Sequence, residues 1–143
     1  MYSRWFVKIA YVSKRMNIGI YDTLYSFEDS DDRLHKLSEF KREEGKHTMM
    51  MVKFLSDRGI NIPHRGGELA EKFGRNIGRA VSAFGWQSVC IFMCMEEVLE
   101  KRFLKTISIF SNRMSRENAW KYILFDDERH SQWWIDCFFN RRN

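Results

Sequence analysis

The chain has 143 residues with 44% hydrophobic and 15% aromatic content, one proline, eight glycines and a formal net charge of +5. This length predicts a single domain, residues 1–143, and the scarcity of turn-forming residues argues against a loop-rich all-β fold. Basic residues are scattered among acidic ones outside a short tail, Arg141 and Arg142. Because a nucleic-acid-binding protein needs a clustered basic stripe, no nucleic-acid partner is expected.

The first half of the sequence predicts two long helices. Apolar residues recur with a helical period from about Ser3 to Phe27. The acidic segment 28–33 supplies turn and capping residues, so a second helix is expected from about Asp31 to Arg58, with Gly59 as its C-terminal cap. The predicted inward stripe of the first helix is Trp5, Ile9, Val12, Met16, Ile20, Leu24 and Phe27. The predicted stripe of the second helix is Leu37, Phe40, Glu44, His47, Met51 and Leu55.

The second half predicts two further helices. After a loop that contains Pro63, Gly66 and Gly67, a third helix is expected over about residues 68–110. A break over residues 111–118 precedes a fourth helix, expected over about residues 115–139. The predicted stripe of the third helix is Ile77, Val81, Phe84, Phe92, Glu96, Leu99 and Phe103. The predicted stripe of the fourth helix is Trp120, Leu124, Asp127, His130, Trp134 and Cys137.

Three glycines interrupt the third predicted helix. Gly74, Gly78 and Gly85 each lower helix propensity by roughly 1 kcal/mol relative to alanine, and close approach of a neighbouring helix is the expected reason. The four helices are separated by short turns, except for a longer loop between the second and the third. This pattern predicts an all-α fold, a four-helix bundle with a longer crossover between its second and third helices.

Two acid-x-x-His motifs lie on predicted inward stripes. Glu44 and His47 in the second helix, like Asp127 and His130 in the fourth, are three residues apart and therefore share a helix face. Burial of these carboxylates and imidazoles is costly unless cations compensate it, and such groups are natural ligands of divalent metals. With Glu96 on the stripe of the third helix, the pattern matches the ligand set of ferritin-like di-iron or di-manganese proteins. The alternative is a metal-free cluster in which these groups satisfy one another or pair with Arg102 and Arg129.

The first predicted helix lacks the inward glutamate that such a site needs. Its stripe offers Met16 and Ile20, whereas Asp22 lies about 160 degrees away from the stripe. Tyr21 is an unusual alternative oxygen ligand. The sequence therefore predicts either a site that holds one metal ion, with a second bound weakly or not at all, or a helix whose true phase differs from the one assumed.

The segment IGRAVSAFGWQSVCIFMCMEEVLEKRF, residues 77–103, resembles the third helix of the demethoxyubiquinone hydroxylases, ferritin-like di-iron proteins of ubiquinone biosynthesis. The family's segment has a glycine in a stretch of small residues, then a second glycine, then an apolar run that ends in Val-Glu-Glu. The corresponding residues here are Gly78, Gly85 and Met95-Glu96-Glu97. The resemblance covers about residues 15–135 at the level of motifs. It implies that the metal ligands are Glu44, His47, Glu96, Asp127 and His130.

The sequence departs from this family at three places. The family's first-helix glutamate falls near Ile20 or Tyr21, and its fourth-helix glutamate is the shorter Asp127. The His-Tyr pair that follows its third-helix glutamate is replaced by Arg102 and Phe103. These differences bear on quinone hydroxylation more than on membership of the wider ferritin-like class.

Three functions follow as alternatives. The first is a di-iron oxidase or monooxygenase that activates oxygen and hydroxylates or oxidises an apolar, quinone-like molecule, with two iron ions, or manganese, as cofactor. The second is a ferritin-like protein that oxidises or stores iron. The third is a non-catalytic bundle with a degenerate metal site that serves as an interaction partner.

The partners and the compartment are predicted from apolar surface and cysteine use. Met49, Met50, Met51 and Val52 make the second helix apolar around more than one face, which favours a homodimer contact, a lipid-like substrate or a membrane surface. The three cysteines are expected to be buried thiols in a reducing compartment. We therefore expect a cytoplasmic protein that can associate peripherally with a membrane.

Overall fold

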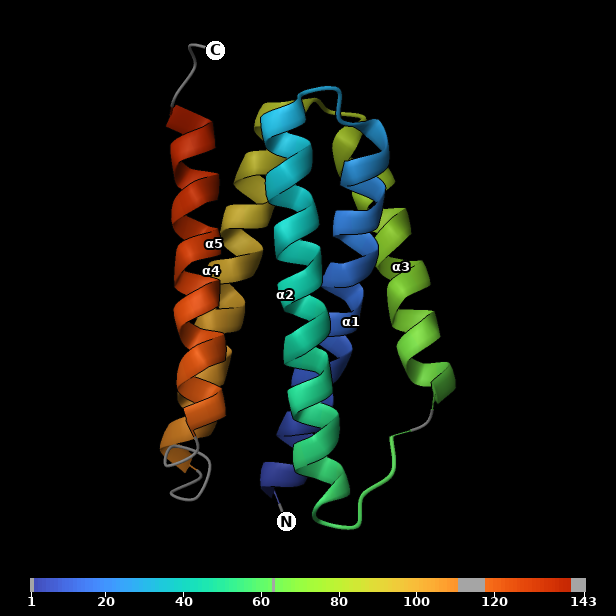
Figure 1. Cartoon of the computed structure of the whole chain (residues 1–143), viewed down its shortest axis with the longest axis vertical. Coiled ribbons are helices and arrows are strands. Elements are labelled where there is room, and N and C mark those ends of the chain that lie inside the picture. The colour runs from blue at the N-terminus through green and yellow to red at the C-terminus, as the bar shows by residue number, and fades with distance from the viewer. Residues whose placement is uncertain (1, 63, 111–117, 140–143) are drawn as a thin grey trace. The chain divides into compact units, whose positions relative to one another are not determined.

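The computed structural model describes residues 2–62, 64–110 and 118–139, and these residues form α-helices and no β-strand. The helices are α1 (Tyr2–Phe27), α2 (Asp31–Ser56), α3 (His64–Ser82), α4 (Trp86–Phe110) and α5 (Asn118–Phe139). The predicted all-α class is confirmed. The helices group into two compact units, unit 1 (Met1–Ala83) with α1 to α3 and unit 2 (Phe84–Asn143) with α4 and α5 (Figure 1). The single domain and the ferritin-like bundle stay predictions, and so does the break at 111–118, most of which lies outside the described residues.

The segment predicted as one third helix is two helices, so the described chain has five helices where four were expected. α3 ends at Ser82 and α4 begins at Trp86. Between them Gly85 has a φ of +88°, a left-handed conformation that glycine adopts without steric cost. No atom lies within 4 Å of the place where its Cβ would be. Gly85 is therefore a helix-ending residue and not the close-packing position that the sequence predicts.

In unit 1, α1 packs against both α2 and α3 and lies between them (Figure 1). Glycines let α1 and α3 approach closely. A Cβ at Gly74 would lie 2.0 Å from the carbonyl oxygen of Met16, and one at Gly19 would lie 2.1 Å from that of Glu71. Gly78 is also too close to α1 for a side chain. The predicted close approach is confirmed at Gly74 and Gly78.

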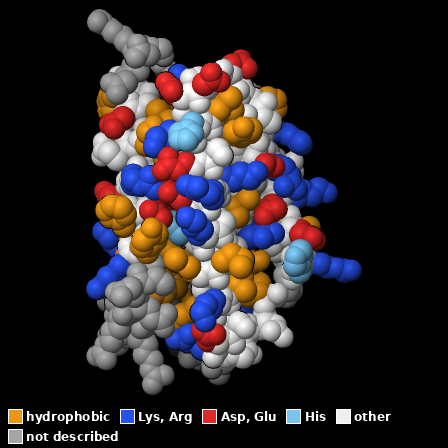
Figure 2. Space-filling view, viewed as in Figure 1, with side chains coloured by type: hydrophobic (Ala, Val, Ile, Leu, Met, Phe, Trp, Pro, Cys, Tyr) orange, Lys and Arg blue, Asp and Glu red, His pale blue; other side chains and the backbone are white. Residues whose placement is uncertain are grey.

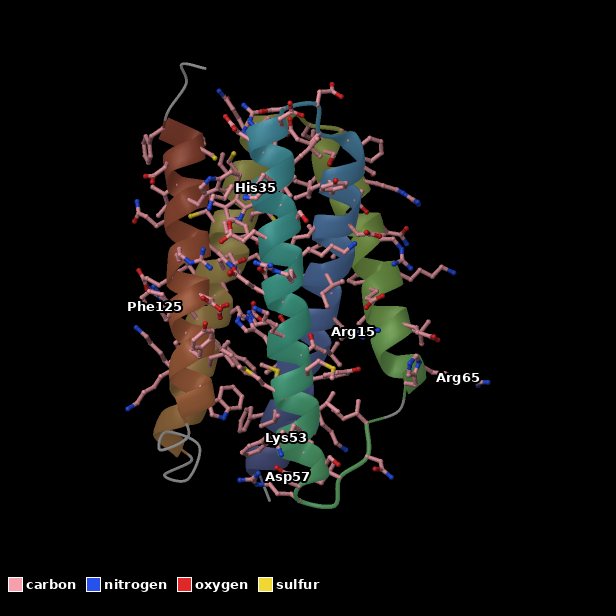
Figure 3. The ribbon with its side chains drawn as sticks, in the orientation of Figure 1. Arg15, His35, Lys53, Asp57, Arg65 and Phe125 are labelled. Carbon is pink, nitrogen blue, oxygen red and sulfur yellow. The ribbon has the colours of Figure 1, made fainter. Side chains whose placement is uncertain are left out.

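Polar contacts border this glycine seam. The Arg15 guanidinium forms an ion pair of 2.8 Å with Glu71, and Figure 3 labels Arg15 where α1 and α3 lie side by side. The Thr23 hydroxyl donates to the carbonyl oxygen of Arg75 at 3.2 Å. Both contacts join α1 to α3, so small residues and polar cross-links hold this helix pair together.

The second predicted helix is confirmed in its start, its inward stripe and its end. α2 begins at Asp31, and all six residues of its predicted stripe are buried. At its end Gly59 has a φ of +68°, its N–H donates to Ser56 O, and the Ile60 N–H donates to Leu55 O at 3.0 Å. These two bonds form a Schellman motif, in which glycine closes the helix.

The inward stripe of α1 differs from the predicted one. Trp5 is 63% exposed, and Val12 and Phe27 are also exposed. The residues buried in their place include the polar side chains of Lys14 and Asn17. The reason is that α1 contacts a helix on each of two sides, so its buried surface is wider than one apolar stripe.

In unit 2, α4 and α5 pack against each other as an antiparallel pair (Figure 1). The aromatic residues Trp86, Trp133 and Trp134 cluster, with ring centroids of the last two 4.7 Å apart. The part of the predicted third-helix stripe that falls on α4 is incorrect in phase, since Leu99 is 63% exposed. The buried stripe of α4 consists of Val89, Cys90, Met93, Glu97, Glu100 and Leu104.

Charged and apolar side chains share the surface. Figure 2 shows acidic and basic side chains intermixed on the face in view, with apolar groups between them. Exposed apolar residues include Met49 on α2 and Phe125 on α5, and the latter projects away from its helix (Figure 3). Among the described residues, no helix combines the length and the apolar composition that crossing a bilayer requires.

Candidate metal site

The first acid-x-x-His motif is buried in unit 1. Glu44 and His47 on α2 are almost completely inaccessible to solvent, as their places on the predicted inward stripe require. The Nδ1 atom of His47 lies 3.6 Å from Oε1 of Glu44. The pair therefore directs a carboxylate and an imidazole towards each other inside unit 1.

The residue that α1 presents to this pair is a lysine. Lys14 donates a hydrogen bond from Nζ to Oε1 of Glu44 at 3.1 Å, and both side chains are 0% exposed. Lys14 is not among the residues predicted to face inward on α1. A site of the predicted kind needs a carboxylate from this helix, whereas α1 places an ammonium group at Glu44.

The two alternative ligands considered for α1 lie elsewhere. The carboxylate of Asp22 is half-exposed and forms an ion pair with Lys41 of α2. Tyr21 is fully buried, and its ring packs edge-on against Phe40 with centroids 6.0 Å apart. These contacts direct Asp22 towards Lys41 and Tyr21 towards Phe40.

The second motif contributes to a buried cluster in unit 2. Glu97 of α4 and Asp127 and His130 of α5 are all 0% exposed. Oε1 of Glu97 lies 3.3 Å from Nδ1 of His130. Each of the three residues offers one ligand atom, and these atoms all lie within 4.8 Å of one another. Two carboxylates and one imidazole at this separation can hold a metal ion.

The acid that α4 contributes to this cluster is Glu97 and not the predicted Glu96. Glu96 is only half-buried, and its place is in a neighbouring group of acids with Glu97 and Glu100, whose oxygens also lie within 4.8 Å of one another. One residue along a helix is a rotation of about 100°. The buried stripe of α4 therefore passes through Glu97, one position after the predicted Glu96.

Electrostatics around Glu97 favour a cation. The pKa of the Cys94 thiol, one helical turn earlier, is raised by burial and then by the negative charge of Glu97. The Glu97 and Asp127 carboxylates, with oxygens at most 4.8 Å apart, repel each other by about 3 kcal/mol at an effective dielectric constant of 20. A divalent cation between them replaces this repulsion with attraction.

The two arginines predicted as partners in a metal-free cluster are Arg102 and Arg129. Arg129 pairs with Asp126 on its own helix at 3.4 Å, and Arg102 is exposed. Lys101 of α4 pairs with the exposed Glu128 of α5 and lowers the pKa of that carboxyl. The Lys101–Glu128 pair joins α4 to α5, and the Arg129–Asp126 pair lies within α5.

The donor set of Glu97, Asp127 and His130 has two oxygen ligands and one nitrogen ligand, which suits first-row divalent metals. His47 and Glu44 remain close to each other in unit 1, with Lys14 between α1 and α2. The chain matches no protein-family model, no curated protein and no solved structure. The resemblance to the demethoxyubiquinone hydroxylases therefore stays a prediction from the sequence.

Proposed function

We propose that this protein binds one divalent transition-metal ion through Glu97, Asp127 and His130, and that the bound metal serves the oxidation of an apolar small molecule. The observation that carries the proposal is the burial of two carboxylates and one imidazole with ligand atoms within 4.8 Å. Such a cluster is costly in a protein interior without a compensating cation. Iron and manganese are the proposed metals, because they accept both oxygen and imidazole ligands.

The chemistry proposed for the site is supported by its apolar surroundings. A redox-active metal held by carboxylates and imidazole supplies one-electron and oxygen chemistry. The protein orients the ligands, since Glu97 lies 3.3 Å from the His130 imidazole, and it excludes water from them. Trp134 follows His130 by one helical turn and packs with Trp86 and Trp133. An apolar, quinone-like substrate is suited to an aromatic wall of this kind.

A second candidate function is supported by unit 1. The Lys14 ammonium already neutralises Glu44, so the two motifs do not offer the equal pair of ligand sets that a dimetal enzyme uses. A bundle that descends from such an enzyme and has lost part of its site would show this pattern. Its function would be interaction with a partner, without oxygen chemistry.

Metal analysis and oxygen consumption distinguish these functions. The purified chain is loaded with Fe(II) or Mn(II) without oxygen, desalted and analysed for metal. We expect about one ion per chain, lost in Asp127→Asn and retained in Asp126→Asn, which changes the adjacent acid. A chain that retains no metal after loading would overturn the proposal and leave the non-catalytic function.

The iron-loaded protein is then exposed to oxygen with and without a short-chain quinol. Oxygen uptake that rises with the quinol, and continues over many turnovers, supports oxidation of an apolar molecule. Uptake that stops once the added iron is oxidised would instead assign the protein to iron handling. Asp127→Asn serves as the control for uptake by iron free in solution.

A further inference from the structure

Lys14 is the only lysine among the described residues whose side chain is completely buried, and it lies in the middle of α1. An ammonium group in a protein interior loses its hydration, which costs several kcal/mol unless a close anion compensates it. The Glu44 carboxylate supplies that anion from α2 at 3.1 Å. Lys14 and Glu44 are therefore a buried ion pair that joins α1 to α2.

The oxygen that accepts this bond also faces the imidazole. Oε1 of Glu44 lies 3.1 Å from Nζ of Lys14 and 3.6 Å from Nδ1 of His47. A carboxylate oxygen beside an imidazole nitrogen, both buried, is the arrangement that binds a metal cation in metalloproteins. Here a cation of the protein's own chain stands at that carboxylate.

Two further side chains with polar groups are buried on the same side of α1 as Lys14. Asn17 and Tyr21 follow Lys14 along α1 at intervals of three and four residues and are also fully buried. These spacings place the three side chains along one side of the helix. The flexible four-carbon stem of lysine spans the distance between the helices and carries a compact charge to its end.

We propose that the Lys14 ammonium takes the position of a metal ion between Glu44 and His47, so that this pair holds no metal of its own, and that a carboxylate at position 14 would convert the pair into a metal site. The inference concerns unit 1 alone and does not depend on the function proposed for unit 2. It explains why the chain keeps an acid-x-x-His motif on α2 while α1 offers it no acidic ligand.

The test is the metal content of Lys14→Glu in an Asp127→Asn background, which removes the proposed unit 2 site. Loading with Mn(II) followed by desalting should leave about one ion per chain in this variant and none in Asp127→Asn alone. Addition of Glu44→Gln should abolish the gain. Lys8→Glu is the matched control, because Lys8 is exposed on the same helix and its replacement makes the same change in charge. Equal metal content in the Lys14 and Lys8 variants, both helical by circular dichroism, would overturn the proposal.

A double-mutant cycle decides the matter if Lys14→Glu does not fold. Lys14→Met should lower the Tm by about 10 °C, because it leaves the Glu44 carboxylate buried without its ammonium partner. The same change in a Glu44→Gln background should lower the Tm by only about 3 °C, and added Mn(II) should restore stability to Lys14→Met alone. A Lys14→Met effect that is equal in both backgrounds would show that Lys14 does not compensate Glu44, and would refute the inference.

Discussion

The adjacent acids Glu96 and Glu97 allow a sharp test of the unit 2 site. Both replacements by glutamine remove one charge at nearly constant volume, but only Glu97 lies beside His130 and Asp127. We expect Glu97→Gln to abolish stabilisation by metal and Glu96→Gln to preserve it. The alternative, in which the sequence-based choice of Glu96 is right, gives the opposite result.

The expected magnitude follows from the geometry and from mass action. Two carboxylates within 4.8 Å repel each other by about 3 kcal/mol at an effective dielectric constant of 20, and a bound cation removes that cost. A metal present at a hundred times its Kd stabilises the folded chain by about 2.7 kcal/mol. For a chain of this length that free energy corresponds to a rise in Tm of roughly 5–10 °C.

The assay is thermal unfolding of the wild type and both variants, monitored by circular dichroism with and without Mn(II). Wild type and Glu96→Gln should gain roughly 5–10 °C with metal, and Glu97→Gln should gain less than about 2 °C. Titration calorimetry should give a weaker affinity for Glu97→Gln by a factor of at least about 10–100. Equal metal-induced shifts in all three proteins would refute the assignment of the unit 2 cluster as a metal site.

Two further predictions concern packing and pH. Gly74→Ala should lower stability by about 1–3 kcal/mol, because its Cβ would lie 2.0 Å from Met16 O. Gly45→Ala, with open space around its Cβ, should raise stability by up to about 1 kcal/mol. Urea unfolding of both variants measures the contrast, and equal effects would contradict the close approach of α1 and α3. Lys101 lowers the pKa of Glu128. The small contribution of this exposed pair to the stability of the fold should therefore be present at neutral pH. It should be lost as the pH falls below about 4.5 and through the lowered pKa. The Tm difference between wild type and Glu128→Gln should therefore shrink towards acid pH, and a difference that grows would contradict the pairing.

The sequence predicted α2 well because its signals agree with one another. Acidic residues precede its start, its apolar residues recur strictly at helical spacing, and Gly59 marks its end. The helix packs against one neighbour in unit 1, α1. A single stripe therefore described its buried side, and Glu44 and His47 were placed inward correctly.

α3 and α4 were predicted less accurately than α2, because glycine has two uses. Gly74 and Gly85 look alike in the sequence, yet one admits a neighbouring helix and the other supplies the positive φ that ends a helix. Only the tertiary neighbours separate these uses. Treating the two helices as one also gives α4 the wrong phase, and for this reason the sequence predicts an inward Glu96 where the buried residue is Glu97.

The burial of Lys14 depends on a residue thirty positions away, so no local pattern contains it. Lysine is almost never fully buried without a partner, and its default place is the surface. Tyr11, Lys14 and Tyr21 recur at helical spacing and form a buried stripe. In the sequence alone Lys14 looks like a surface residue, because its partner Glu44 lies on another helix. The same kind of motif therefore has two outcomes in this chain. In unit 1 an ammonium meets the carboxylate, whereas in unit 2 two carboxylates meet one imidazole, and this difference is the physical reason for the metal proposed at the second motif.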